Sequence, residues 1–91
     1  MAHWEYATLI MGTPGKDGRC WRKVLPDPNT PGPIVGKAEP AKFLSRLYQG
    51  VRLLDSAIEE MDKDGWELVS QSFDGLLFYF YGVVVFRRPK E

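Results

Sequence analysis

The sequence has few of the residues that usually build a catalytic or metal site. Its 91 residues include one cysteine, Cys20, and one histidine, His3. A single cysteine excludes an internal disulfide and favours a reducing compartment. One cysteine and one histidine supply at most half of a zinc site. We therefore expect a cytoplasmic protein with no metal and no other cofactor.

The chain also lacks an excess charge of either sign and a long hydrophobic run. Twelve Lys and Arg residues balance twelve Asp and Glu residues, which argues against non-specific binding to a nucleic acid. The N-terminus has no basic segment followed by an apolar run, so we expect no secretory signal. The apolar residues 76–86 are too few for a membrane-spanning helix, which needs about 20. We expect no membrane partner.

Short apolar stretches separated by glycine and proline predict strands at both ends of the chain. Residues 4–11, 66–73 and 77–87 are rich in aromatic and aliphatic side chains, which favour strands. Residues 19–25 alternate less regularly and are a candidate strand that would form a hairpin with the first. The Asp-Gly pair at 74–75 predicts a tight turn between the last two strands.

The middle of the chain divides into a loop and a helix. Residues 26–40 hold five prolines and two glycines, which exclude a helix or a central strand and predict a long loop. Residues 40–64 repeat apolar side chains at steps of three and four, which predicts a helix with a kink or break at Gly50 as an option. Its expected buried stripe comprises Leu44, Leu47, Val51, Leu54, Ile58 and Met61.

These elements predict one α+β domain over residues 1–91. We expect a small, twisted, mostly antiparallel sheet of three or four strands, with one long helix packed on one face. The first strand is expected to return beside the last one, in the middle of the sheet or across it.

Three motifs in a fixed order resemble a known family. WEY at 4–6, DGWELVS at 64–70 and VVVFRRPK at 83–90 are similar to motifs of small bacterial and phage proteins catalogued as domain of unknown function 4177. The region between Gly12 and Glu39 is longer than the usual pattern of that family. The resemblance implies a fold of strand, helix, strand and strand, and it implies no activity and no catalytic residue.

Four residues within these motifs are expected to be structural. Large aromatic rings usually pack in cores, and a glycine just after a helix can take the left-handed conformation that ends it. We expect the ring of Trp66 to cover the junction of helix and sheet. The residues with this expected role are Trp4, Tyr6, Gly65 and Trp66.

The stretch FYFYGVVVF at residues 78–86 has no polar face. In a regular strand Phe78, Phe80, Gly82, Val84 and Phe86 share one face, and Tyr79, Tyr81, Val83 and Val85 share the other. One helix can cover only one face, and so much exposed apolar surface is unusual in a monomer. We expect the tyrosine–valine face to make a homo-oligomer, a dimer or larger, with cover by the 26–40 loop as the alternative.

Basic residues cluster at two places in the chain. Guanidinium groups beside an indole ring can hold a phosphate and stack on a base. The pattern predicts a charged edge strand that discourages aggregation, with a site for a nucleotide or another small anion as the alternative. The candidate ligand-binding residues are Arg19, Trp21, Arg22 and Lys23 in the first cluster, and Arg87 and Arg88 in the second.

No group of residues in the sequence indicates catalysis. GTPGKDG at 12–18 lacks the spacing and the hydroxyl of a phosphate-binding loop, and the acidic residues near the helix end resemble a solvated charge run. The predicted function is a non-catalytic, self-associating interaction module. The first alternative is an oligomeric protein that binds or sequesters a small phosphorylated molecule, and the second is an enzyme of unidentified type.

Overall fold

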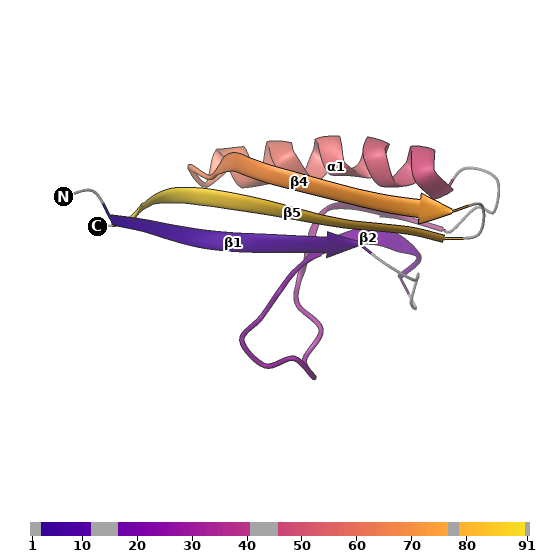
Figure 1. The fold of residues 1–91 in the computed structure, drawn as a ribbon, viewed down its shortest axis with the longest axis horizontal. Helices are drawn as coiled ribbons and strands as arrows, with labels where there is room; N and C mark the ends of the chain where they lie inside the picture. Colours follow the sequence, from indigo (N-terminus) through magenta and orange to yellow (C-terminus); the bar gives the residue numbers. More distant parts are fainter. Residues whose placement is uncertain (1–2, 12–16, 41–45, 77–78, 91) are drawn as a thin grey trace.

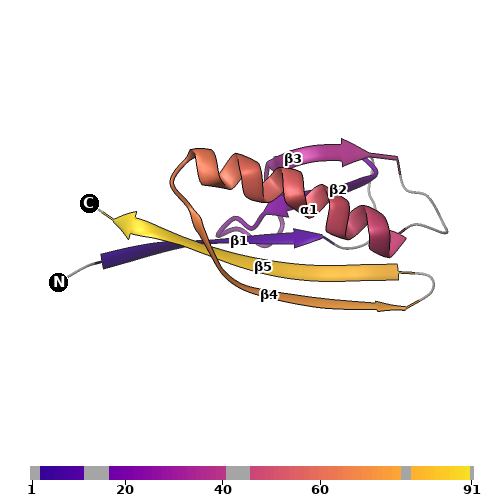
Figure 2. The ribbon, with the colours of Figure 1, turned by 90° about the horizontal axis from the view of Figure 1, so that it is seen from above.

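The computed structural model describes residues 3–11, 17–40, 46–76 and 79–90. Five strands form one antiparallel sheet in the order β3-β2-β1-β5-β4, and a helix lies on one face of it (Figures 1 and 2). The predicted α+β class is confirmed, with five strands in place of three or four. The elements are β1 (His3–Met11), β2 (Arg19–Lys23), β3 (Ile34–Glu39), α1 (Arg46–Lys63), β4 (Glu67–Leu76) and β5 (Tyr79–Lys90).

β1 occupies the middle of the sheet because both of its edges are paired. Its whole length runs antiparallel to β5, from His3 opposite Lys90 to Met11 opposite Gly82. Its other edge pairs with β2. The first strand therefore returns beside the last one, as predicted, and the two ends of the chain lie close together (Figure 2).

The core lies between α1 and one face of the sheet, and Trp21 is at its centre. The Trp21 side chain is 0% exposed, and its Nε1 donates a hydrogen bond to the carbonyl oxygen of Gly50 at 3.0 Å. Its ring meets the edge of the Phe73 ring with centroids 6.3 Å apart. Around it lie the buried side chains of Leu9, Met11, Val35, Leu53, Ala57, Met61, Val84 and Phe86.

α1 is a continuous helix across Gly50, and its buried face includes Leu54 and Met61 of the predicted stripe, with Ile58 packed against the core. Val51 departs from the prediction because it is about half exposed, whereas Leu53 and Ala57 are buried. The small residues Gly50 and Ala57 let Trp21 and β3 approach the helix backbone, which widens the buried face toward Leu53 and Ala57. Leu44 lies outside the described residues, as does the side chain of Leu47.

Part of the predicted 26–40 loop is a strand. β3 pairs with β2 from Ile34 opposite Arg22 to Glu39 opposite Arg19. Prolines exclude a central strand but allow an edge strand, and here they flank β3 without interrupting it. The remaining segment, residues 24–33, projects on the side of the sheet opposite α1 (Figure 1).

β4 continues through the predicted Asp-Gly turn. Asp74 pairs with Tyr81, and Gly75 pairs with Phe80, after a bulge between Leu68 and Ser70. The connection to β5 therefore falls at residues 77–78, which lie outside the described part of the chain. A long ladder with β5 outweighs the local preference of Asp-Gly for a turn.

Gly36 and Gly65 have similar positive φ values but different surroundings, so they can be compared to measure the effect of close packing. Gly36 in β3 has φ 80°, and Gly65 after α1 has φ 85°. A Cβ on Gly36 would lie 2.6 Å from the backbone nitrogen of Ala57, whereas a Cβ on Gly65 would meet no described atom within 4 Å. The conformation of Gly65 agrees with its expected place at the helix end.

We expect Gly36→Ala to destabilise the fold more than Gly65→Ala. Gly65→Ala adds only the cost of a left-handed backbone, about 1–2 kcal/mol. Gly36→Ala carries that cost and also pushes β3 away from α1, which adds about 1–3 kcal/mol of overpacking. Urea unfolding of both variants measures the difference, and equal losses would contradict the close approach of β3 to α1.

Candidate functional site: the open face of the sheet

The face of the sheet opposite α1 carries the candidate site, and we call it the open face. Core residues alternate along β1 and β5 with residues that point the other way, since successive side chains of a strand lie on opposite faces. The open face comprises Trp4, Tyr6, Thr8 and Ile10 of β1, together with Tyr81, Val83, Val85 and Arg87 of β5.

The middle of the open face is an apolar row across the two central strands. Ile10 lies opposite Val83, and Thr8 lies opposite Val85. Val83 and Val85 are half-buried among their neighbours, whereas Tyr6 is 61% and Tyr81 is 49% exposed. The row therefore offers solvent a strip of aliphatic and aromatic surface.

The structure brings three of the four residues predicted for self-association onto this one face. Tyr81, Val83 and Val85 lie there, while Gly82, Val84 and Phe86 are buried beneath α1. The side chains of Tyr79, Phe78 and Phe80 lie outside what the structure describes. Sequence reasoning missed the contribution of β1, which the alternation of WEYATLIM could have revealed.

Tyr6 and Trp4, for which the sequence predicts a structural role, lie on the open face. The guanidinium carbon of Arg87 lies 4.2 Å from the centroid of the Trp4 ring, and the Arg87 Nε donates to a carboxylate oxygen of Glu67 at 2.6 Å. The cross-strand pair of Glu67 with Arg87 neutralises the charge at this end of the open face.

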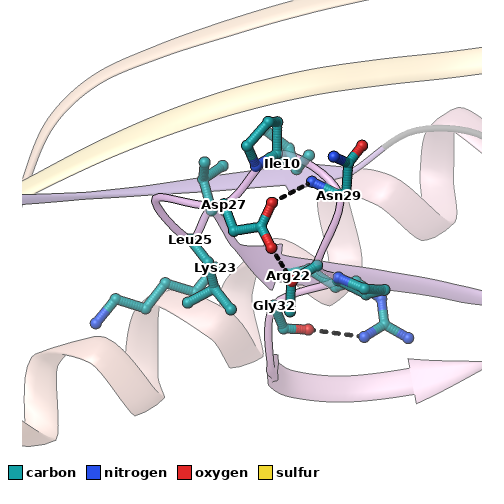
Figure 3. Close-up of a pocket in the computed structure, with 11 residues that line it drawn as sticks. Ile10, Arg22, Lys23, Leu25, Asp27, Asn29 and Gly32 are labelled. Carbon is teal, nitrogen blue, oxygen red and sulfur yellow. Dashed lines mark hydrogen bonds between the residues drawn. The ribbon is translucent and has the colours of Figure 1, made fainter.

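A pocket of about 250 Å³ lies between the 24–33 segment and the open face (Figure 3). Ile10 and Leu25 contribute apolar walls. Arg22 borders the pocket, and its Nη1 donates a hydrogen bond to the carbonyl oxygen of Gly32 at 2.8 Å. Nη2 of the same guanidinium group pairs with the Asp17 carboxylate. Sites for drug-sized ligands usually span about 300–1,000 Å³, so this pocket suits a single side chain better than a nucleotide.

Asp27 holds the turn that forms the outer wall of the pocket (Figure 3). One carboxylate oxygen accepts from the Thr30 hydroxyl at 2.6 Å, and the other accepts from the Asn29 backbone N–H at 3.0 Å. The Thr30 hydroxyl first, and then the Asn29 N–H, hold the pKa of Asp27 below its ordinary value, because both stabilise the carboxylate.

The residues predicted to bind an anion do not converge on one site. Arg19 and Trp21 are buried on the side facing α1, and a ring with no exposed surface cannot stack on a ligand, so the position of Trp21 contradicts its predicted role. Arg22 and Arg87 lie on the open face, each paired with a carboxylate. Lys23 lies on the helix side. Anion binding by the exposed residues stays a prediction.

Lys23 and Arg88 meet at Trp66, a contact that sequence reasoning missed. The Lys23 Nζ lies 5.5 Å and the Arg88 Cζ 4.2 Å from the centroid of the Trp66 ring. Arg88 also donates to the carbonyl oxygen of Asp64 at 2.9 Å and pairs with Glu5. Arg88 thus binds the C-terminal end of α1, where a cation is favourable, beside a hollow lined by acidic and basic groups.

Cys20 is buried, and its surroundings do not activate it. Burial raises the pKa of the Cys20 thiol, and the nearby charge of Arg22 lowers it only in part. A protonated thiol is a weak nucleophile. Among the described residues, no group of histidine, cysteine and acidic side chains could hold a metal ion, and no helix is long and apolar enough to cross a membrane.

Comparison with known proteins finds no match for the chain. No family model matches it, and neither a curated protein nor a solved structure does. The resemblance to domain of unknown function 4177 therefore stays a prediction.

We expect Thr30→Val to raise the pKa of Asp27 toward about 3.9, the value for an unperturbed aspartate. The pKa of Asp27 is lower in the folded state than its ordinary value. The carboxylate therefore stabilises the turn fully when the pH is above the ordinary pKa, and this stabilisation is lost as the pH falls through the folded-state pKa. Titration of the Asp27 carboxyl by NMR measures the change. Asn29→Ala is the control, since it keeps the backbone N–H. An unchanged pKa in Thr30→Val would contradict the role of the hydroxyl.

Proposed function

We propose that this chain is a small, non-catalytic interaction module that self-associates through the open face of its sheet. The observation that carries the proposal is the apolar row of Ile10, Val83 and Val85, flanked by the exposed rings of Tyr6 and Tyr81. The 24–33 segment projects from the same side of the sheet, yet it leaves Tyr81 49% exposed. A second copy is the covering that this composition suits, because tyrosines bury a ring and keep a polar tip.

The area exposed by the chain supports an assembly. Its accessible surface is 6348 Å², whereas a folded monomer of 10.4 kDa exposes about 5,400 Å². The excess of roughly 950 Å² resembles the area of about 800 Å² that one partner buries in a standard interface.

The charges at the ends of the open face also suit burial of its middle. Arg87 pairs with Glu67 at one end, and Arg22 pairs with Asp17 near the other. A second copy could therefore cover the apolar row without burying an uncompensated charge, which would be costly. Because these arginines are already occupied, the alternative of a small-anion site has weaker support.

We expect Tyr81→Glu or Val83→Glu to abolish association through the open face. Each places a carboxylate in the apolar row, where an isologous interface would bring two copies of it close together. Native mass spectrometry and sedimentation velocity at micromolar concentration measure the oligomeric state.

Tyr48→Glu is the matched control for these variants. Tyr48 is an exposed tyrosine on α1, so the same substitution there should leave the oligomeric state unchanged. Wild-type protein that remains monomeric at micromolar concentration would contradict the proposal, as would an oligomer size that both open-face variants leave unchanged.

A further inference from the structure

The two edges of the sheet differ, and the β3 edge is obstructed by α1. The backbone N–H of Gly36 donates to the Glu60 carboxylate, and that of Lys37 donates to the Ser56 hydroxyl at 3.0 Å. These donors are occupied by helix side chains and are not available to another strand. The positive φ of Gly36 further interrupts a regular edge.

The β4 edge lies away from α1. β4 is the outermost strand on the other side, and α1 lies toward β3 (Figure 2). All side chains of residues 67–74 are exposed, and Leu68 and Phe73 are 41% and 40% exposed although they are apolar. The strand ELVSQSFDGL contains no lysine, arginine or proline, and its features that oppose edge pairing are two carboxylates, Glu67 and Asp74, and the bulge between Leu68 and Ser70.

We propose that β4 pairs antiparallel with β4 of a second copy around a two-fold axis, so that one sheet continues across both copies. This inference adds a second surface of self-association to the proposed function. It rests on the proposed function for the tendency of the chain to self-associate. Within the described residues, β1, β2 and β5 have a strand on each side, and β3 is obstructed. A second copy can therefore offer only its own β4, which closes a symmetric pair and cannot propagate a fibre.

The bulge and the side-chain pattern indicate the register. The irregularity between Leu68 and Ser70 confines regular pairing to residues 70 onward. Directly opposed residues share a face, and an axis at Phe73 would place the two Phe73 rings opposite each other on the helix side. The same register places Ser72 opposite Asp74 of the second copy, so that each carboxylate faces a hydroxyl and not a like charge.

The edge contact and the open-face contact have perpendicular symmetry axes. A two-fold axis that continues a sheet is perpendicular to it, whereas one that stacks two open faces lies in the plane of the sheet. Two such axes that intersect close an assembly of four copies. We include this intersection in the proposal, and so expect four copies when both contacts form.

Oligomer size in native mass spectra separates the two contacts. Tyr81→Glu should reduce four copies to two, joined by β4. For the edge, Gln71→Pro and Ser72→Pro are made separately, because successive N–H groups of a strand point to opposite sides. The variant that keeps the wild-type circular dichroism and melting temperature has lost an outward donor, and it should give two copies joined by the open face. Gln71→Ala is the control and should keep four, because it leaves the backbone N–H of residue 71 and the Ser72 hydroxyl in place.

The outcomes distinguish failure of this inference from failure of the proposed function. Monomeric Tyr81→Glu with an associated wild type overturns the β4 contact alone, as does a folded proline variant that keeps four copies. Wild-type pairs that survive Tyr81→Glu and separate in the proline variant support the β4 contact and contradict the open-face proposal. A monomeric wild type contradicts both.

Amide hydrogen exchange of the wild type tests the same contact without a substitution. If both proline variants unfold, alternate amides of residues 70–74 should still become protected as protein concentration rises. Exchange at these amides that is independent of concentration, while the protein associates, would overturn the inference.

Discussion

The buried ring of Trp21 determines which side of the sheet faces the helix. Its Nε1 donates to the Gly50 carbonyl at 3.0 Å, and its ring is so close to Gly82 that a Cβ there would lie 2.6 Å from it. This one side chain therefore joins β2, α1 and β5. Because side chains alternate along a strand, placing Trp21 inside also places Arg22 on the open face. The chemistry of the open face follows from the packing of the opposite one.

Strong local patterns in the sequence predicted the features that depend on alternation and helical period. The FYFYGVVVF stretch placed Val84 and Phe86 on the inner face and Tyr81, Val83 and Val85 on the other, and the structure confirms this separation. The helix and the return of the first strand beside the last were also predicted. These features could be predicted because many residues in each element indicate the same structure, so one residue that departs from the pattern does not change the prediction.

Features that depend on one tertiary contact were not predictable. The Ile-Val pair that begins β3 is too short to predict a strand among the prolines around it. An edge strand forms there because β3 pairs with β2 and its backbone N–H groups bond to side chains of α1. Asp74 and Gly75 have the composition of a turn but lie within β4, since pairing with β5 continues past them. The anion-site prediction failed at Trp21 for the same reason: whether an indole is a core residue or a platform depends on which face meets the helix.

The same imbalance between one helix and five strands accounts for both surfaces on which the proposals depend. α1 lies toward β3, so its side chains occupy the β3 edge and leave β4 uncovered on the helix side as well as at its edge. A second helix would be the usual means to cover such a sheet, and the described residues form one helix. Copies of the same chain can supply the missing layer and the missing neighbouring strand together, and a small domain gains more from such burial than a large one, because it covers a smaller share of its own surface.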